Sequence, residues 1–266
     1  MSDSQRATKR APMDSMRKTA LVAGIFYLIT FVSIPTLALY GDVKTDPNYI
    51  LSAGSDTGIL VGGFLEMIVA LAGIATAVAL FSVLKRQNEG LALGLITTRI
   101  FEGAVIVIGV ANILSVVTLH QPGASGPEAT SLAIVGQAHV ATFNWSFLLG
   151  QSLMPGLNAL LLGTLMYQSR LVPRVLPVLG LIGAPVLIIA TVATGFGLIE
   201  QYSALGGLAA VPIALWELSL GLWLAFKGFN RSSPLMVAAA ADAASRDDST
   251  PNAPLPAAVA TKTGVA

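Results

Sequence analysis

Six apolar segments, each long enough to cross a lipid bilayer, constrain this chain more than any other feature of its sequence. A transmembrane helix needs roughly 20 apolar residues at about 1.5 Å each. Lipid offers no partner to a free backbone N–H or C=O, so each segment is expected to be helical. The predicted spans are Thr19–Leu39, Gly58–Leu84, Leu91–Leu119, Ala138–Met166, Val175–Leu198 and Leu205–Phe226. We therefore predict an all-α fold, a polytopic membrane bundle of six transmembrane helices.

The composition favours the same class. Only 11% of residues are charged and 54% are hydrophobic, whereas soluble domains carry about 25% charged residues. The expected surroundings are therefore a lipid bilayer. A net charge of +1 gives no sign of a nucleic-acid partner. Cysteine is absent, which excludes disulfides, thiolate metal ligands and cysteine nucleophiles.

The first apolar segment follows basic residues, as the core of a cleaved signal peptide does. Its apolar run of about 21 residues exceeds the 7–15 that are usual for such a core. It ends in Leu37-Ala38-Leu39-Tyr40, which is not a small-x-small cleavage pair. We expect it to stay in the protein as the first transmembrane helix.

Basic residues predict the orientation of the bundle. The opposite loops hold only Lys44, together with several acids. Cytoplasmic loops carry an excess of Lys and Arg, so both chain ends are expected to be cytoplasmic, N-in and C-in, in a cell (inner) membrane. The basic residues of the cytoplasmic side are Arg6, Lys9, Arg10, Arg17, Lys18, Lys85, Arg86, Arg170, Arg174, Lys227 and Arg231.

The connections leave no room for a second folded domain. The longest outer loop, from His120 to about Gln137, has no periodic apolar pattern and is expected to be irregular. The transmembrane domain is predicted over residues 17–231. Residues 1–16 and the alanine-rich segment 232–266 are expected to be disordered cytoplasmic tails, because they bury little apolar surface.

Prolines and glycines predict local features of the helices. Pro35, Pro155, Pro185 and Pro212 fall inside predicted spans, and each removes a backbone N–H, which leaves an earlier carbonyl unpaired. The glycine pairs Gly58/Gly62 and Gly180/Gly183 permit close approach of neighbouring helices.

Four ionisable residues lie within the predicted spans. Arg99 is about 8 residues, roughly 12 Å, from the basic end of its helix, and Glu102 is one turn deeper on the same face. Glu217 lies at a similar depth, roughly 14 Å, on a helix of opposite direction. These three side chains are therefore expected to share one site. Glu66 lies nearer the outer face.

A charge at the centre of a bilayer costs at least ~2.5–3.5 kcal/mol, so these groups should face the bundle interior or a wet cavity. One arginine among three carboxylates favours protonation of at least one glutamate near pH 7. Three interpretations of Arg99, Glu102 and Glu217 stay open. They are a structural clamp between helices, a binding site for a solute or a proton, or an arginine that reaches the lipid headgroups.

The fourth predicted helix carries a polar stripe. Asn144, Gln151 and Asn158 are spaced by seven residues, which places them on one face. Pro155 frees the carbonyl of Gln151 on the same face. We expect this stripe to face inward, either as packing between helices or as part of the polar site.

Sequence motifs for catalysis and cofactors are not evident. There is no P-loop, no H-E-x-x-H and no G-x-S-x-G. His120 and His139 flank the longest outer loop, but two histidines alone give little support for a metal site. We therefore predict no cofactor and no metal ion.

Three segments give the chain a resemblance to a known family. They are Leu80–Gly103 (LFSVLKRQNEGLALGLITTRIFEG), Ser169–Pro185 (SRLVPRVLPVLGLIGAP) and Pro212–Phe229 (PIALWELSLGLWLAFKGF). The chain resembles, from about Arg17 to Asn230, the bacterial membrane proteins catalogued as domain of unknown function 4386. The resemblance implies a six-helix inner-membrane protein and transfers neither catalytic residues nor a substrate.

Two function classes therefore stay open, with a third beside them. The first is a transporter of a small solute, or a proton-coupled carrier, with a polar site near the membrane midplane. The second is a structural or regulatory membrane component whose buried polar residues only clamp helices. An intramembrane enzyme would use Glu102 or Glu217 as acid or base, but no nucleophile or metal motif supports it.

Overall fold

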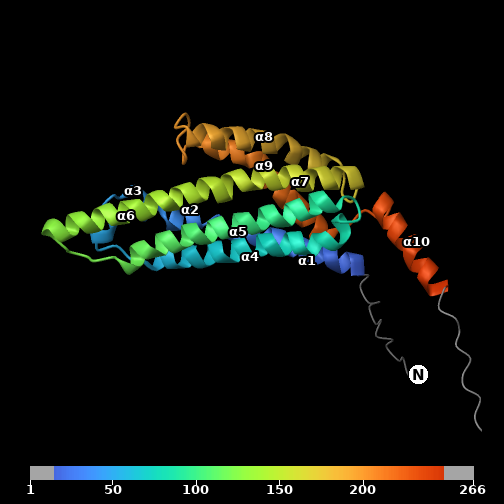
Figure 1. Cartoon of the computed structure of the whole chain (residues 1–266), viewed down its shortest axis with the longest axis horizontal. Coiled ribbons are helices and arrows are strands. Elements are labelled where there is room, and N and C mark those ends of the chain that lie inside the picture. The colour runs from blue at the N-terminus through green and yellow to red at the C-terminus, as the bar shows by residue number, and fades with distance from the viewer. Residues whose placement is uncertain (1–14, 249–266) are drawn as a thin grey trace, which may run out of the picture.

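The computed structural model describes residues 15–248 and confirms an all-helical multi-pass membrane fold (Figure 1). In this part of the chain, six helical segments are long and apolar enough to cross a membrane. The first three are α1 (Ser15–Ile29) with the 3-10 turn η1 (Thr30–Ser33), α4 (Thr57–Leu84) and α5 (Glu89–Thr118). The fourth combines α6 (Gly126–Ser146), η3 (Phe147–Leu153) and α7 (Met154–Ser169), and the last two are α8 (Val175–Gly195) and α9 (Ala204–Phe226).

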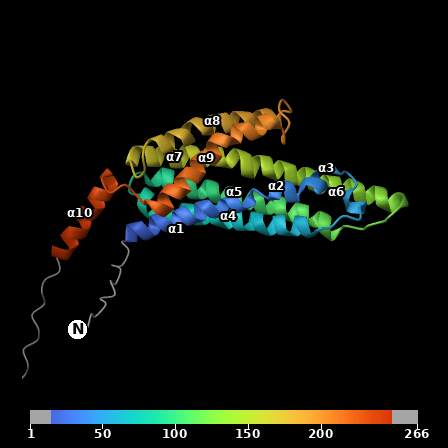
Figure 2. The same ribbon diagram turned by 180° about the vertical axis from the view of Figure 1, so that it is seen from behind.

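The spans form an elongated bundle built from two antiparallel pairs. The α4–α5 pair lies along one side, and the α8–α9 pair lies along the other (Figures 1 and 2). α1 packs between α4 and α9, while α7 packs between α5 and α8. The end of the bundle that carries the start of α1 and the helix α10 (Pro234–Asp248) is called the terminal end, and the opposite end the distal end.

Close helix contacts depend on glycine, as predicted for Gly180 and Gly183. A methyl group at Gly180 would come within 2.8 Å of the Trp216 ring, and one at Gly183 within 2.8 Å of Pro212 Cβ. α8 and α9 can therefore approach closely only with glycine at these positions. Pro185 and Pro212 lie inside α8 and α9 without ending either helix.

The first span ends earlier than predicted. The sequence favoured one helix to Leu39, but the chain breaks after Ile29 into η1 and then α2 (Thr36–Leu39), α3 (Gly41–Thr45) and η2 (Tyr49–Leu51). The hydroxyls of Thr30 and Thr36 donate to carbonyls three residues earlier, at 2.6 Å each. Such local bonds compete with the α-helical pattern, and Pro35 offers no N–H, so regular helix ends here.

The irregular loop predicted from His120 to about Gln137 is mostly helix, and that prediction was wrong. α6 begins at Gly126, with Pro127 in its first turn, where a missing N–H costs nothing. Gly136 of α6 lies against Ile50 of η2. A methyl group added at Gly136 would lie 3.3 Å from the Cβ atom of Ile50. Packing on η2 thus supports a helical extension that has no apolar periodicity of its own.

The segment 232–266, predicted to be disordered, contains α10 over residues 234–248. Its run of alanines favours helix, because alanine has the highest intrinsic helix propensity, and Leu235 and Met236 at its start pack against the core. Residues 249–266, and residues 1–14 of the other predicted tail, lie outside the described part of the chain.

Candidate functional site

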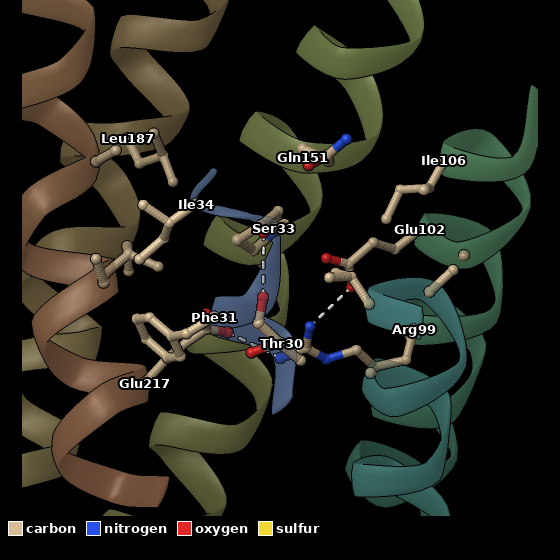
Figure 3. A pocket seen from close by; sticks show the side chains of 18 residues that line it. Thr30, Phe31, Ser33, Ile34, Arg99, Glu102, Ile106, Gln151, Leu187 and Glu217 are labelled. Carbon is tan, nitrogen blue, oxygen red and sulfur yellow. Dashed lines mark hydrogen bonds and ion pairs between the residues drawn. The ribbon is translucent and has the colours of Figure 1, made fainter. Parts of the chain in front are cut away.

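Arg99 joins three helices near the centre of the bundle. Its Nη1 donates to Glu102 Oε2 at 2.9 Å, and its Nη2 donates to Glu217 Oε1 at 2.9 Å and to the Tyr27 hydroxyl at 3.1 Å. Figure 3 shows Arg99 and Glu102 projecting from α5 toward the space that Glu217 enters from α9. Arg99, Glu102, Glu217 and Tyr27 are called the arginine centre below.

The arginine centre extends to α7 through Asn158. The amide of Asn158 donates to Glu102 Oε2 at 2.8 Å, and the hydroxyl of Thr98 donates to the Asn158 carbonyl oxygen at 2.6 Å. Asn158 is 1% exposed and Arg99 5%, while the Glu217 side chain is 17% exposed. Glu217 is therefore the partner of Arg99 that a ligand could reach most easily.

A small cavity of about 200 Å³ lies beside the arginine centre. Arg99, Glu102 and Glu217 line it together with Gln151 of η3. Its remaining wall comes largely from η1, α4, α8 and α9, with Ser33, Gly73, Leu187 and Ala210 among the lining residues. The cavity thus joins two carboxylates and one guanidinium to mostly apolar walls.

Glu66 belongs to a separate polar contact. It is 1% exposed, and its Oε1 accepts a hydrogen bond from Gln151 Nε2 at 3.2 Å. Its Oε2 has no hydrogen-bond partner among the described residues, and neither has the buried hydroxyl of Tyr40. Gln151 therefore connects the wall of the small cavity, which already includes Glu102 and Glu217, to a third carboxylate, that of Glu66.

The polar stripe Asn144, Gln151 and Asn158 does not form one site. Asn158 joins the arginine centre, Gln151 contacts Glu66, and Asn144 accepts hydrogen bonds from Gln201 and Tyr202 near the start of α9. Residues seven apart on a helix differ by about 10 Å in height, so a common face does not bring them together. The π-helical segment η3 also shifts the α-helical phase between them.

A larger cavity of about 520 Å³ adjoins the small one toward the distal end. Gln151, Leu187 and Ala210 line both cavities. Lys44 of α3 also lines the large cavity, and its amine lies 4.2 Å from the centroid of the Tyr202 ring. Burial lowers the pKa of Lys44, and the nearby Glu66 carboxylate opposes that change.

The two histidines have separate partners at the distal end. The ring nitrogens of His120 lie 2.8 Å from Asp56 Oδ2 and 2.7 Å from the Ser52 carbonyl oxygen, while His139 contacts Asn112. No group of three metal-ligating side chains occurs within residues 15–248. The contacts of His120 hold the loop after α5 against the start of α4.

Sequence reasoning missed Tyr27, Thr98 and Lys44. A tyrosine in an apolar span is a signal for the first, because a buried hydroxyl needs a polar partner. Thr98 precedes Arg99 but looks like an ordinary helix residue. Lys44 stood out only as the single cation of the distal loops, and no pattern placed it beside a cavity.

Six apolar spans around a buried arginine–glutamate centre define a multi-pass helical membrane protein. The chain belongs to the family described as Domain of unknown function (DUF4386), which matches residues 22–228. The match covers nearly all of the six spans and leaves α10 outside. No curated protein and no solved structure matches the chain.

Proposed function

We propose that the protein is a carrier for a small solute, coupled to protons at the arginine centre. The adjoining cavities are the observation that carries this proposal. They share the lining residues Gln151, Leu187 and Ala210. A solute in the large cavity would therefore be next to the small cavity, which the arginine centre lines. Ionisable residues within membrane spans commonly mark solute or proton paths. π-helical segments such as η3, which forms part of both walls, are frequent at functional sites.

Proton coupling follows from competition for Arg99. Glu217 contacts Arg99 and is the more exposed of its two carboxylate partners. A proton on Glu217 removes its charge and weakens its bond to the guanidinium. Arg99 then offers a donor to an acidic group of the solute, because an arginine binds a carboxylate or phosphate with directed N–H groups. Glu102 stays paired through Asn158 and Arg99 and keeps the guanidinium oriented.

The proposed location is the cytoplasmic (inner) membrane of a bacterium, with both chain ends in the cytoplasm. The excess of Lys and Arg in the loops of the terminal end supports this orientation. Lys44 is the single lysine or arginine in the loops of the distal end. The large cavity would then face the outside.

Cysteine accessibility tests the carrier proposal, because the natural chain has no cysteine. A membrane-impermeant thiol reagent is applied separately to each side of membranes that hold Ala210→Cys. A carrier exposes its site to both sides in turn, so labelling is expected from either side. Ser131→Cys should react only from outside, and Ser232→Cys only from the cytoplasm. Ala159→Cys, which is 2% exposed in the core, should not react.

Labelling of Ala210→Cys from the outside alone, with Ser232→Cys reactive from the cytoplasm, would contradict a carrier. It would favour a structural or regulatory membrane component, the second candidate. A specific observation supports that candidate as well: both terminal nitrogens of Arg99 already have protein partners on α1, α5 and α9. Such a network is able to clamp helices without any ligand.

A further inference from the structure

The large cavity combines apolar walls with one cation, Lys44. Phe147, Leu148, Leu187 and Ala190 supply much of its apolar surface. Its hydroxyls are engaged with the backbone, since Thr191 and Thr194 donate to carbonyls four residues earlier in α8. The amide of Gln201 and the hydroxyl of Tyr202 both donate to Asn144. Among the residues that line this cavity, Lys44 is the one with a cationic side chain, and its ammonium can donate to an anion.

Lys44 has no carboxylate partner within residues 15–248. The ion pairs in that part of the chain join Arg99 to Glu102 and Glu217, and His120 to Asp56. Glu66 acts on Lys44 electrostatically but does not line the cavity. Lys44 is partly buried and lies over the Tyr202 ring, which is a favourable but weak contact for an ammonium.

We propose that the large cavity binds an acidic amphiphile, whose carboxylate or phosphate pairs with Lys44 and whose apolar body lies among Phe147, Leu148 and Leu187. A volume of about 520 Å³ lies within the range of small-molecule sites, which are mostly apolar with a few polar groups that fix orientation. An anion at Lys44 gains a charge-assisted hydrogen bond in a partly desolvated place. The role of the amphiphile as a transported substrate rests on the proposed carrier, whereas the existence of the binding site does not.

Radiolabelled dodecanoate is the probe, measured by scintillation proximity on the full chain in phosphatidylcholine nanodiscs, with empty nanodiscs subtracted. Binding is expected for the natural protein. Lys44→Met should raise the Kd about tenfold or more, because it removes a hydrogen bond to a charged group. Lys44→Arg should retain binding. Lys85→Met, which removes an exposed lysine at the other end of the bundle, is the matched control and should not change the Kd.

A second variant tests the cavity without changing its charge. Ala190→Trp fills the large cavity and should abolish dodecanoate binding, whereas Ile189→Trp, on the exposed face of the same helix, should not. Dodecyltrimethylammonium and butyrate serve as competitors. Neither should displace the probe, because the first has the wrong charge and the second lacks the apolar body. Displacement by either one, or an unchanged Kd in Lys44→Met, would overturn the proposal.

Nanodiscs that contain phosphatidylglycerol identify the source of the amphiphile. Loss of dodecanoate binding in them assigns the site to an anionic lipid, and unchanged binding assigns it to a free organic acid. Both results uphold the acidic amphiphile. Labelling of Ala210→Cys uses no amphiphile, so failure of this inference and failure of the carrier proposal are seen in different experiments.

Discussion

At the arginine centre each charged group has a partner on another helix, whereas nearer the distal end Glu66 and Tyr40 keep buried polar atoms that have no partner among residues 15–248. The first region lines part of a small cavity, and in the second region Glu66 accepts a hydrogen bond from Gln151, which lines the large one. Complete pairing stabilises one arrangement of helices, while incomplete pairing leaves groups able to accept a new partner. The difference suggests that the arginine centre holds the bundle together and that the distal region adapts.

Loss of Arg99 is expected to have the largest effect on stability. Arg99→Met leaves the buried Glu102 carboxylate without its cation, which costs about 3–5 kcal/mol when one partner of a buried pair is removed. The melting temperature in detergent should fall steeply. Arg231→Met, which removes an exposed arginine, should change stability by less than about 0.5 kcal/mol. Adding Glu102→Gln and Glu217→Gln to Arg99→Met should restore part of the loss. Equal melting temperatures for Arg99→Met and the natural protein would show that the arginine centre does not stabilise the bundle more than the distal region does.

Glutamate-to-glutamine substitutions compare the two regions directly. Glu102→Gln replaces an acceptor of bonds from Arg99 and Asn158, so a loss of about 1–3 kcal/mol is expected. Glu66→Gln can keep its single bond from Gln151 and places an amide where Oε2 had no partner, so its stability should stay within about 1 kcal/mol of the natural protein. Thermal melts of both variants under one condition provide the test. A larger loss for Glu66→Gln would reverse the assignment of the rigid region.

The contacts of His120 predict a pH-dependent distal end. Burial alone disfavours the imidazolium, but hydrogen bonds to Asp56 and the Ser52 carbonyl outweigh it and raise the pKa of His120. A raised folded-state pKa gives stability that is fully present below about pH 6.5, the unfolded value, and is lost as pH rises through the higher folded value. Tyr49 stacks on the ring and donates to Asp56, and burial together with Asp56 raises its pKa to about 12, so it stays neutral throughout.

Hydrogen exchange of the amides of Gln121 and Gly123, which donate to Ile50 and Leu51, measures this effect. After correction for intrinsic exchange, protection should fall between pH 6 and pH 9 by roughly 1 kcal/mol of opening free energy, the contribution of one hydrogen bond. Asp56→Asn removes the carboxylate and should shift the loss of protection to lower pH. Protection that stays constant over this range in the natural protein would show that the imidazolium does not hold the loop.

Much of the fold could be predicted because the bilayer imposes a simple rule on sequence. The spans at α4, α5, α8 and α9 begin and end within a few residues of the apolar segments. The first span and the start of α6 differ, since hydroxyl-to-backbone bonds, Pro35 and packing on η2 act there instead of hydropathy. The hydropathy of a segment does not predict such contacts, because they depend on individual side chains and on residues far away in the sequence.

The candidate site could be predicted only where residues of opposite charge lie at the same depth in the membrane. Arg99 and Glu217 lie at matching depths on antiparallel helices, and their contact follows from the cost of leaving either in lipid. Helical spacing placed Asn144, Gln151 and Asn158 on one face, but the same spacing sets neighbours in this series about 10 Å apart in height, and the residues that each one meets could not be predicted. Residues of η3, α8 and α9 line both cavities, so the cavities depend on the arrangement of three segments that are far apart in the sequence.

Two tyrosines provide the finest test of the comparison, because both are almost fully buried and differ mainly in pairing. The Tyr27 hydroxyl accepts a hydrogen bond from Arg99, while the Tyr40 hydroxyl has no partner in the described chain. Tyr27→Phe should therefore cost about 0.5–1 kcal/mol, moderated by the second acceptor that Glu217 gives to the same nitrogen. Tyr40→Phe removes an unpaired hydroxyl at unchanged shape and should leave stability equal or slightly higher. A larger loss of stability for Tyr40→Phe than for Tyr27→Phe would show that the Tyr40 hydroxyl has a hydrogen-bond partner when the protein is in the membrane. The distal region would then be as completely paired as the arginine centre.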